Sequence, residues 1–125
     1  MSAGKILVVD DEPQLRRVMK VTLTSEGYEV TDASTGEQAT ERIRQDRFDL
    51  ILLDMNMPRV DGYHVLRTIR YEKHLKDVPV VVFTGAGERA CEDALRLGAD
   101  DFLIKGATSV PQIMQCVGRF LGKSA

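Results

Sequence analysis

Short apolar segments alternate along this chain with longer segments in which apolar residues recur every three or four positions. The apolar segments are rich in Val, Ile, Leu and Phe and lie at residues 6–9, 28–31, 50–53, 80–83 and 102–104, the second being the weakest. Runs of this length and composition are typical of strands that are buried on both faces, as in a parallel sheet.

Each apolar segment is followed by a predicted amphipathic helix. The predicted helices cover residues 13–25, 36–46, 62–71, 88–97 and a last segment that begins near 109. Ser34 with Glu37, and Ser109 with Gln112, have the spacing of capping boxes at two of the helix starts. The strict alternation predicts an α/β fold, a doubly wound parallel sheet with helices on both faces.

Polar residues follow all five predicted strands, with Asp32 and Ser34 after the second. Asp10 and Asp11 follow the first strand, Asp54 the third, Thr84 the fourth and Lys105 the fifth. Ligands of such sheets bind beyond the carboxyl ends of the strands, where these residues converge. The sequence therefore predicts a single rim to which the first, third, fourth and fifth strands bring three carboxylates, one hydroxyl and one ammonium group.

These residue types fit phosphoryl chemistry. Clustered carboxylates repel one another and favour a hard divalent cation such as Mg²⁺. One carboxylate can act as the nucleophile that forms an aspartyl phosphate, while a lysine and a threonine stabilise phosphoryl oxygens. A lone Asp at a strand end is more often a turn or cap residue, but the whole set favours a phosphoryl or metal site.

Length and composition narrow the class of protein. A chain of 125 residues is expected to form one domain over residues 1–125. The net charge of -2 weighs against a direct nucleic-acid partner, and no segment resembles a signal peptide or a membrane span. Cys91 and Cys116 lack metal-site spacing and are expected to be reduced packing residues of a cytoplasmic protein.

Five motifs together resemble the receiver domains of two-component response regulators. They are ILVVDDE at residues 6–12, DLILLDMNMP at 49–58, DG at 61–62, PVVVFTG at 79–85 and GADDFLIK at 98–105. The resemblance extends from residue 5 to about residue 121. It implies a flavodoxin-like (βα)5 fold whose five-stranded sheet has the order 2-1-3-4-5.

The resemblance also implies roles for the acidic residues. Asp54 corresponds to the phosphoacceptor, and Asp10 and Asp11 correspond to the acidic pair, with Asp11 the more direct magnesium ligand. Asp54 and the backbone carbonyl of Asn56 are further expected ligands of Mg²⁺.

Thr84 and Lys105 correspond to the residues that contact phosphoryl oxygens, and Phe102 to an aromatic switch residue coupled to Thr84. The implied partners are a sensor histidine kinase or a histidine phosphotransfer protein as donor, and a downstream protein. The downstream protein is expected to bind the face made by the fourth helix, the fifth strand and the fifth helix. The chain would then be a signalling phosphoacceptor that assists its own phosphorylation and slow dephosphorylation, rather than an enzyme.

A second hypothesis is a phosphorylation-independent adaptor that keeps the fold for binding alone. Receivers of that kind tend to lose the acceptor, the lysine or the acidic pair, all of which are present here. The sequence leaves open whether the chain is a stand-alone receiver or a piece of a larger protein.

One position departs from the family pattern. Gly106 stands where the family has proline after the lysine. Because a cis peptide bond is expensive without proline, we expect a trans Lys105–Gly106 bond with Gly106 making the turn.

Overall fold

The computed structural model describes residues 3–55, 62–85 and 88–122, apart from the side chains of residues 88, 90 and 91. Within these residues, strands and helices alternate from the first element to the last. The order is β1 (Lys5–Val9), α1 (Pro13–Ser25), β2 (Glu29–Ala33), α2 (Gly36–Gln45), β3 (Leu50–Asp54), α3 (Gly62–Tyr71), β4 (Val80–Thr84), α4 (Glu88–Arg96), β5 (Asp101–Ile104) and α5 (Val110–Leu121).

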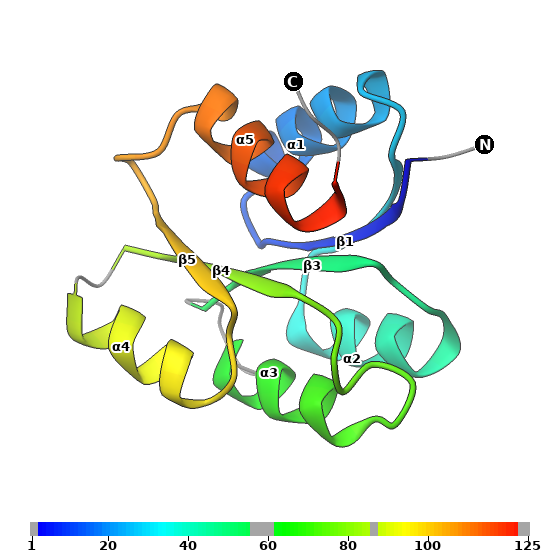
Figure 1. Cartoon of the computed structure of the whole chain (residues 1–125), viewed down its shortest axis with the longest axis vertical. Coiled ribbons are helices and arrows are strands. Elements are labelled where there is room, and N and C mark those ends of the chain that lie inside the picture. The colour runs from blue at the N-terminus through cyan, green and yellow to red at the C-terminus, as the bar shows by residue number, and fades with distance from the viewer. Residues whose placement is uncertain (1–2, 56–61, 86–87, 123–125) are drawn as a thin grey trace.

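The strands form one parallel sheet in the order β2-β1-β3-β4-β5, which confirms the predicted topology (Figure 1). Every residue of β3 and β4 is buried, whereas all four residues of β5, at the edge of the sheet, are only partly buried. The apolar composition of the central strands is therefore explained by helices that cover both of their faces.

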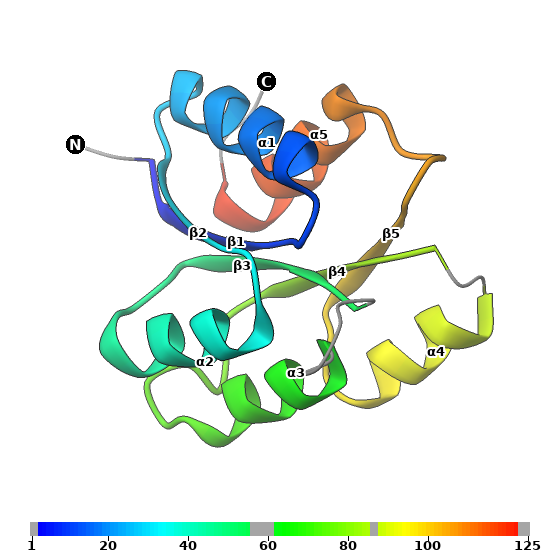
Figure 2. The ribbon, with the colours of Figure 1, turned by 180° about the vertical axis from the view of Figure 1, so that it is seen from behind.

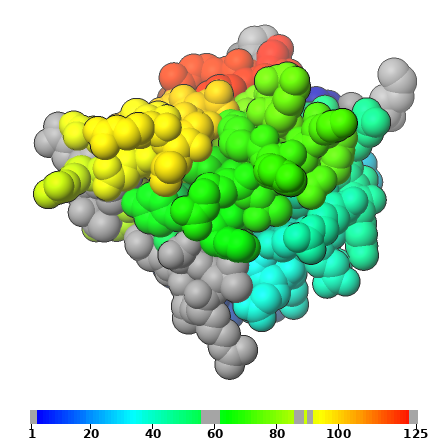
Figure 3. Space-filling model, turned by 90° about the horizontal axis from the view of Figure 1, so that it is seen from below, coloured from blue at the N-terminus to red at the C-terminus, as the bar shows by residue number. Residues whose placement is uncertain are grey.

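Helices α1 and α5 cover one face of the sheet, and α2, α3 and α4 cover the other (Figures 1 and 2). Figure 3 shows the outer side of the second layer, where α2, α3 and α4 lie next to one another. Alternate residues of a strand point to opposite faces and so enter different cores. Leu7 and Val9 belong to the core under α2, α3 and α4, while Ile6 and Val8 belong to the core under α1 and α5.

Several details differ from the sequence-based expectation. Asp54 and Thr84 are the last residues of β3 and β4 and do not follow them. Strand β2 ends at Ala33 rather than at residue 31, because its pairing with β1 continues to the end of β1. Helix α2 is capped by Thr35 and not by Ser34, since the Thr35 hydroxyl accepts a hydrogen bond from the Gln38 N–H. The capping box of Ser109 and Gln112 at α5 is confirmed.

Cys116 is a buried free thiol in α5, as expected, while the side chain of Cys91 lies outside the described residues. Within the part of the chain that the structure describes, no helix is long and apolar enough to cross a membrane.

Candidate functional site

The polar residues at the strand ends converge on one rim of the sheet. Asp54 is the last residue of β3 and pairs in register with Phe83 of β4, so Thr84 lies one residue beyond that pair. Asp10 follows β1, the other neighbour of β3. Asp10 and Asp54 are both fully buried, and Thr84 is 1% exposed. Three polar side chains thus occupy buried positions at the centre of the sheet, where a structural role alone would favour apolar residues.

Lys105, which follows β5, reaches across this rim. Its Nζ donates hydrogen bonds to Asp54 Oδ2 at 2.8 Å and to Glu12 Oε1 at 2.9 Å. Asp10 Oδ2 lies 3.7 Å from the same nitrogen. Burial by itself would lower the pKa of Lys105, but its hydrogen bonds to Asp54 and Glu12 and the nearby carboxylate charges raise the pKa above its ordinary value. The ammonium is therefore a fixed positive charge beside Asp54.

Within the acidic pair, Asp10 is fully buried and Asp11 is half-buried. Asp10 Oδ1 accepts a hydrogen bond from the Glu12 N–H at 2.8 Å. Burial raises the pKa of Asp10 to about 6, although the Glu12 N–H and the Lys105 charge oppose this. Burial, together with the hydrogen bond to Asp54 and the Asp54 charge, also raises the pKa of Asp11. Because both pKa values are raised, a nearby cation would stabilise the ionised form of these carboxylates.

The oxygen atoms at this rim suit a divalent cation. One carboxylate oxygen from each of Asp10, Asp11 and Glu12 can be chosen so that all lie within 4.8 Å of one another. Asp10 Oδ2 is buried and has no hydrogen-bond partner within the described part of the chain. An all-oxygen donor set with such an atom fits Mg²⁺. The predicted carbonyl ligand, Asn56, lies outside the described residues.

The predicted switch residues lie on neighbouring strands, Thr84 on β4 and Phe102 on the edge strand β5. Phe102 of β5 pairs in register with Val82, and Ile104 pairs with Thr84. Phe102 and Thr84 are therefore two positions apart along neighbouring strands and on the same face of the sheet. Phe102 is partly buried against the core under α2, α3 and α4.

The loop after Lys105 turns at Gly106. The Lys105–Gly106 peptide bond is trans, and Gly106 has a φ of 80°, as predicted. A side chain would be strained in this left-handed conformation even though the space around the Cα is open.

The sequence pattern alone did not predict a role for Glu12 at the rim. Glu12 is the N-cap residue of α1, but its side chain makes no capping hydrogen bond and contacts Lys105 instead. Residues at this position usually cap with a short polar side chain, so a Glu before the helix was a usable signal.

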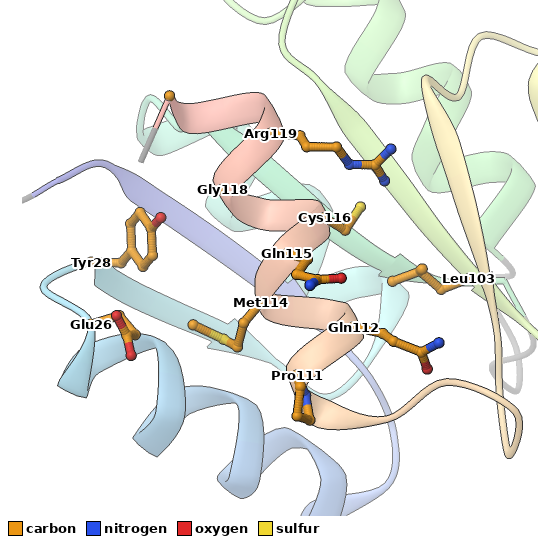
Figure 4. A pocket seen from close by; sticks show the side chains of 11 residues that line it. Glu26, Tyr28, Leu103, Pro111, Gln112, Met114, Gln115, Cys116, Gly118 and Arg119 are labelled. Atoms are coloured by element: carbon orange, nitrogen blue, oxygen red, sulfur yellow. The ribbon is translucent and has the colours of Figure 1, made fainter. Parts of the chain in front are cut away.

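A wide groove lies elsewhere, along α5 (Figure 4). Tyr28 lines one side of α5, Leu103 and Arg119 line the other, and Met114 lies on the helix between them. The groove is not lined by Asp10, Asp11, Asp54 or Lys105 of the rim.

Comparison with known proteins agrees with this geometry. The model of the response regulator receiver domain family matches residues 6–117. The probable transcriptional regulator ycf27 of Porphyra purpurea is 45% identical over 103 residues, covering 81% of this chain and 41% of the relative. The transcriptional regulatory protein ResD of Bacillus subtilis is 39% identical over 102 residues, with 81% and 41% covered. The chain thus spans about two fifths of the length of these relatives.

Solved structures match over nearly the whole chain. The receiver domain of sensor histidine kinase PA1611 from Pseudomonas aeruginosa, which has a magnesium ion coordinated in its active-site cleft, superposes with a TM-score of 0.85 at 31% identity, covering 95% of this chain and 98% of that one. Chemotaxis protein CheY4 of Vibrio cholerae superposes with a TM-score of 0.86 at 28% identity, with 94% and 98% covered. With its parallel sheet and its acidic rim, the chain belongs to the receiver domain family of two-component response regulators.

Proposed function

We propose that Asp54 accepts a phosphoryl group from the phosphohistidine of a sensor kinase or a phosphotransfer protein. One observation carries this proposal: Asp54 is a fully buried carboxylate at the rim, held 2.8 Å from the ammonium of Lys105. An oxygen of Asp54 attacks phosphorus, the P–N bond to the imidazole breaks, and the released ring nitrogen takes up a proton from water. The product is an acyl phosphate on Asp54.

The other residues of the rim stabilise the charge that moves in this step. Lys105 neutralises an oxygen of the transferred group, and the Thr84 hydroxyl donates a hydrogen bond to another. Asp10, Asp11 and Asp54, with the backbone carbonyl of Asn56, would hold Mg²⁺. When bound, this ion offsets the negative charge of the carboxylates and the phosphoryl oxygens.

The proposal is tested by phosphorylating the chain with a small acyl phosphate and Mg²⁺ and measuring the intact mass. We expect one phosphoryl group on the unsubstituted chain and none on Asp54→Asn, because the amide is a poor nucleophile. Asp77→Asn is the matched control, since Asp77 is an exposed residue of the turn before β4. Undiminished labelling of Asp54→Asn would refute the assignment of Asp54.

The same experiment addresses the adaptor hypothesis. An adaptor that does not use phosphorylation would remain unlabelled with Mg²⁺ and donor, although its fold is intact. The unbroken set of Asp10, Asp54 and Lys105 contacts favours the phosphoacceptor.

The α4–β5–α5 face is proposed as the surface that reports phosphorylation to a downstream protein. Thr84 and Phe102 connect this face to Asp54 through neighbouring strands. Movement of Thr84 toward the phosphoryl group would free space into which Phe102 turns, which shifts the population between two packings. The groove beside α5 brings Leu103 and Arg119 to the same face (Figure 4).

Amide hydrogen exchange with and without the acyl phosphate tests this surface. We expect exchange to change in β5 and in the first turns of α5 as well as near Asp54. A change restricted to the neighbourhood of Asp54 would refute the proposed output face.

The relatives named as transcriptional regulators are longer than this chain. A role in controlling transcription is therefore proposed only for a protein in which the receiver is joined to a further segment. The receiver would act on that segment through its conformational state, and not by contacting DNA itself.

A further inference from the structure

Arg16, in the first turns of α1, connects the ends of two strands. Its Nη1 donates a hydrogen bond to the carbonyl oxygen of Asp10 at 2.8 Å, and its Nε donates one to Asp32 Oδ2 at 3.1 Å. Asp32 lies in β2, directly opposite Val8 of β1. The Arg16 side chain is only 20% exposed, so this guanidinium is largely buried between the helix and the sheet.

Asp10 is held on several sides as a result. Its N–H donates to the Ala33 carbonyl at 3.1 Å, its Oδ1 accepts from the Glu12 N–H at 2.8 Å, and its carbonyl accepts from Arg16. The other carboxylate oxygen, Oδ2, is buried without a hydrogen-bond partner among the described residues. The contacts of the other polar atoms thus determine where this oxygen lies, 3.7 Å from the Lys105 ammonium.

Arg16 also fixes the peptide unit that leads to Asp11. A peptide unit is planar, so a hydrogen bond to the Asp10 carbonyl restrains the whole plane between the Cα atoms of Asp10 and Asp11. The direction in which the Asp11 side chain leaves the backbone depends on that plane.

From these contacts we propose that Arg16 is a positioning residue for the metal site, which holds the Asp10–Asp11 backbone so that the two carboxylates face one cation. The inference rests on the proposed function, because it assumes that the acidic rim binds Mg²⁺. Arg16 does not touch the cation itself and acts through the Asp10 carbonyl.

The planar guanidinium is suited to this position. Arginine presents several N–H donors in a rigid fork, so one side chain can bond to Asp10 and Asp32 in different directions. Lys20 also pairs with Asp32, at 3.5 Å, but its side chain is 50% exposed. Among the described residues, Lys20 makes no hydrogen bond or ion pair with Asp10, which makes Lys20 a matched control.

The charge of Arg16 and its positioning role have opposite effects on Mg²⁺ binding. Removing a positive charge near a cation site reduces repulsion and should strengthen Mg²⁺ binding. Releasing the Asp10 carbonyl should weaken it, because groups that orient metal ligands typically contribute about 10–100-fold in affinity. The sign of the change in affinity therefore separates the two roles.

The test is calorimetric titration of the whole chain with MgCl₂ at constant pH and ionic strength. We expect Arg16→Gln and Arg16→Lys each to raise the Kd for Mg²⁺ by about tenfold or more. Lys20→Gln, which removes the same charge from Asp32, is expected to leave the Kd unchanged or slightly lower. Melting curves in the presence of a chelator establish that each variant is folded, and Arg16→Lys is the milder change if Arg16→Gln fails to fold.

A wild-type Kd in Arg16→Lys, or tighter binding by Arg16→Gln, would overturn the positioning role. Equal weakening in Lys20→Gln would also overturn it, because the effect would then come from Asp32 and not from the Asp10 carbonyl. Asp11→Ala, which removes a proposed Mg²⁺ ligand, shows how large the rise in Kd is when the metal site itself is lost. Failure of the unsubstituted chain to bind Mg²⁺ would overturn the proposed metal site together with this inference, whereas normal binding by the unsubstituted chain and by the Arg16 variants would overturn the inference alone.

Discussion

Gly62, the first residue of α3, lies directly against the backbone of Asp54, the proposed phosphoacceptor, and of Met55. A Cβ built on Gly62 would lie 2.5 Å from the Cα of Met55 and 2.8 Å from the carbonyl oxygen of Asp54. Backbone atoms cannot move aside as the end of a long side chain can, so only glycine fits at this contact. At the residue scale, one missing methyl group allows α3 to start beside the end of β3.

Gly62→Ala is therefore expected to lower the free energy of unfolding by about 1–3 kcal/mol, the usual effect of overpacking. Gly85→Ala is the control, because a Cβ at Gly85 meets no atom of the described residues within 4 Å. Its effect on the free energy of unfolding should stay within about 0.5–1 kcal/mol. Urea denaturation of both variants measures the difference, and equal effects of the two substitutions would contradict the proposed clash.

Arg70, in the last turn of α3, ties several elements together at the end of the sheet away from Asp54. Its side chain donates to the carbonyls of Gly98 and Val78, with distances between 2.6 and 3.0 Å. It also pairs with Asp100 Oδ2 at 2.9 Å, and the same oxygen accepts from the Val80 N–H at 2.8 Å. At the element scale, one guanidinium joins α3 to the segments that lead into β4 and β5.

Arg70→Lys should lower the free energy of unfolding by about 2–3 kcal/mol, because an ammonium cannot reach these acceptors with the same fork geometry and leaves carbonyls unpaired. Arg67→Lys in the same helix keeps the charge at an exposed position and should have little effect. Thermal and urea unfolding compare the two variants. Similar stabilities of the two variants would show that Arg70 does not hold these segments together.

At the scale of the whole molecule, the buried acidic rim makes stability depend on pH. Burial raises the pKa of Asp10 from 3.8 to about 6, and Asp11 shifts in the same direction. The folded protein therefore binds these protons more tightly than the unfolded chain does. The stability that protonated Asp10 contributes is fully present below about pH 4 and is lost as the pH rises through about 6.

With a chelator present to remove divalent cations, the free energy of unfolding of the unsubstituted chain should fall relative to that of Asp10→Asn as the pH rises from about 4 to 7. The comparison with Asp10→Asn is needed because other groups titrate in the opposite sense: the hydrogen bond from Lys5 lowers the pKa of Asp46. Mg²⁺ competes with these protons, so added Mg²⁺ should restore more stability at pH 7 than at pH 5. If the difference in free energy of unfolding between the unsubstituted chain and Asp10→Asn does not change with pH, the raised pKa of Asp10 is contradicted.

The sequence by itself determined the class of fold and the composition of the rim. Short apolar runs alternating with amphipathic segments are compatible with few arrangements other than a parallel sheet covered by helices on both faces. Because parallel strands end at the same edge, the positions of Asp10, Asp54, Thr84 and Lys105 after their predicted strands were sufficient to predict that they converge. The turn at Gly106 followed from the family pattern at that position together with local backbone energetics.

Only the tertiary structure decided which groups contact one another across that rim. The ion pair of Glu12 and Lys105 joins residues that are 93 positions apart, and its geometry depends on how α1 and the loop after β5 pack on the sheet. The bond from Arg16 to the Asp10 carbonyl is similar, because a backbone acceptor leaves no trace in the residue pattern. The cap of α2 at Thr35 depended on where β2 stops pairing, and pairing is a property of two strands and not of one. Local periodicity encodes elements and their order, while the contacts that tune charge and position arise from packing between elements distant in sequence.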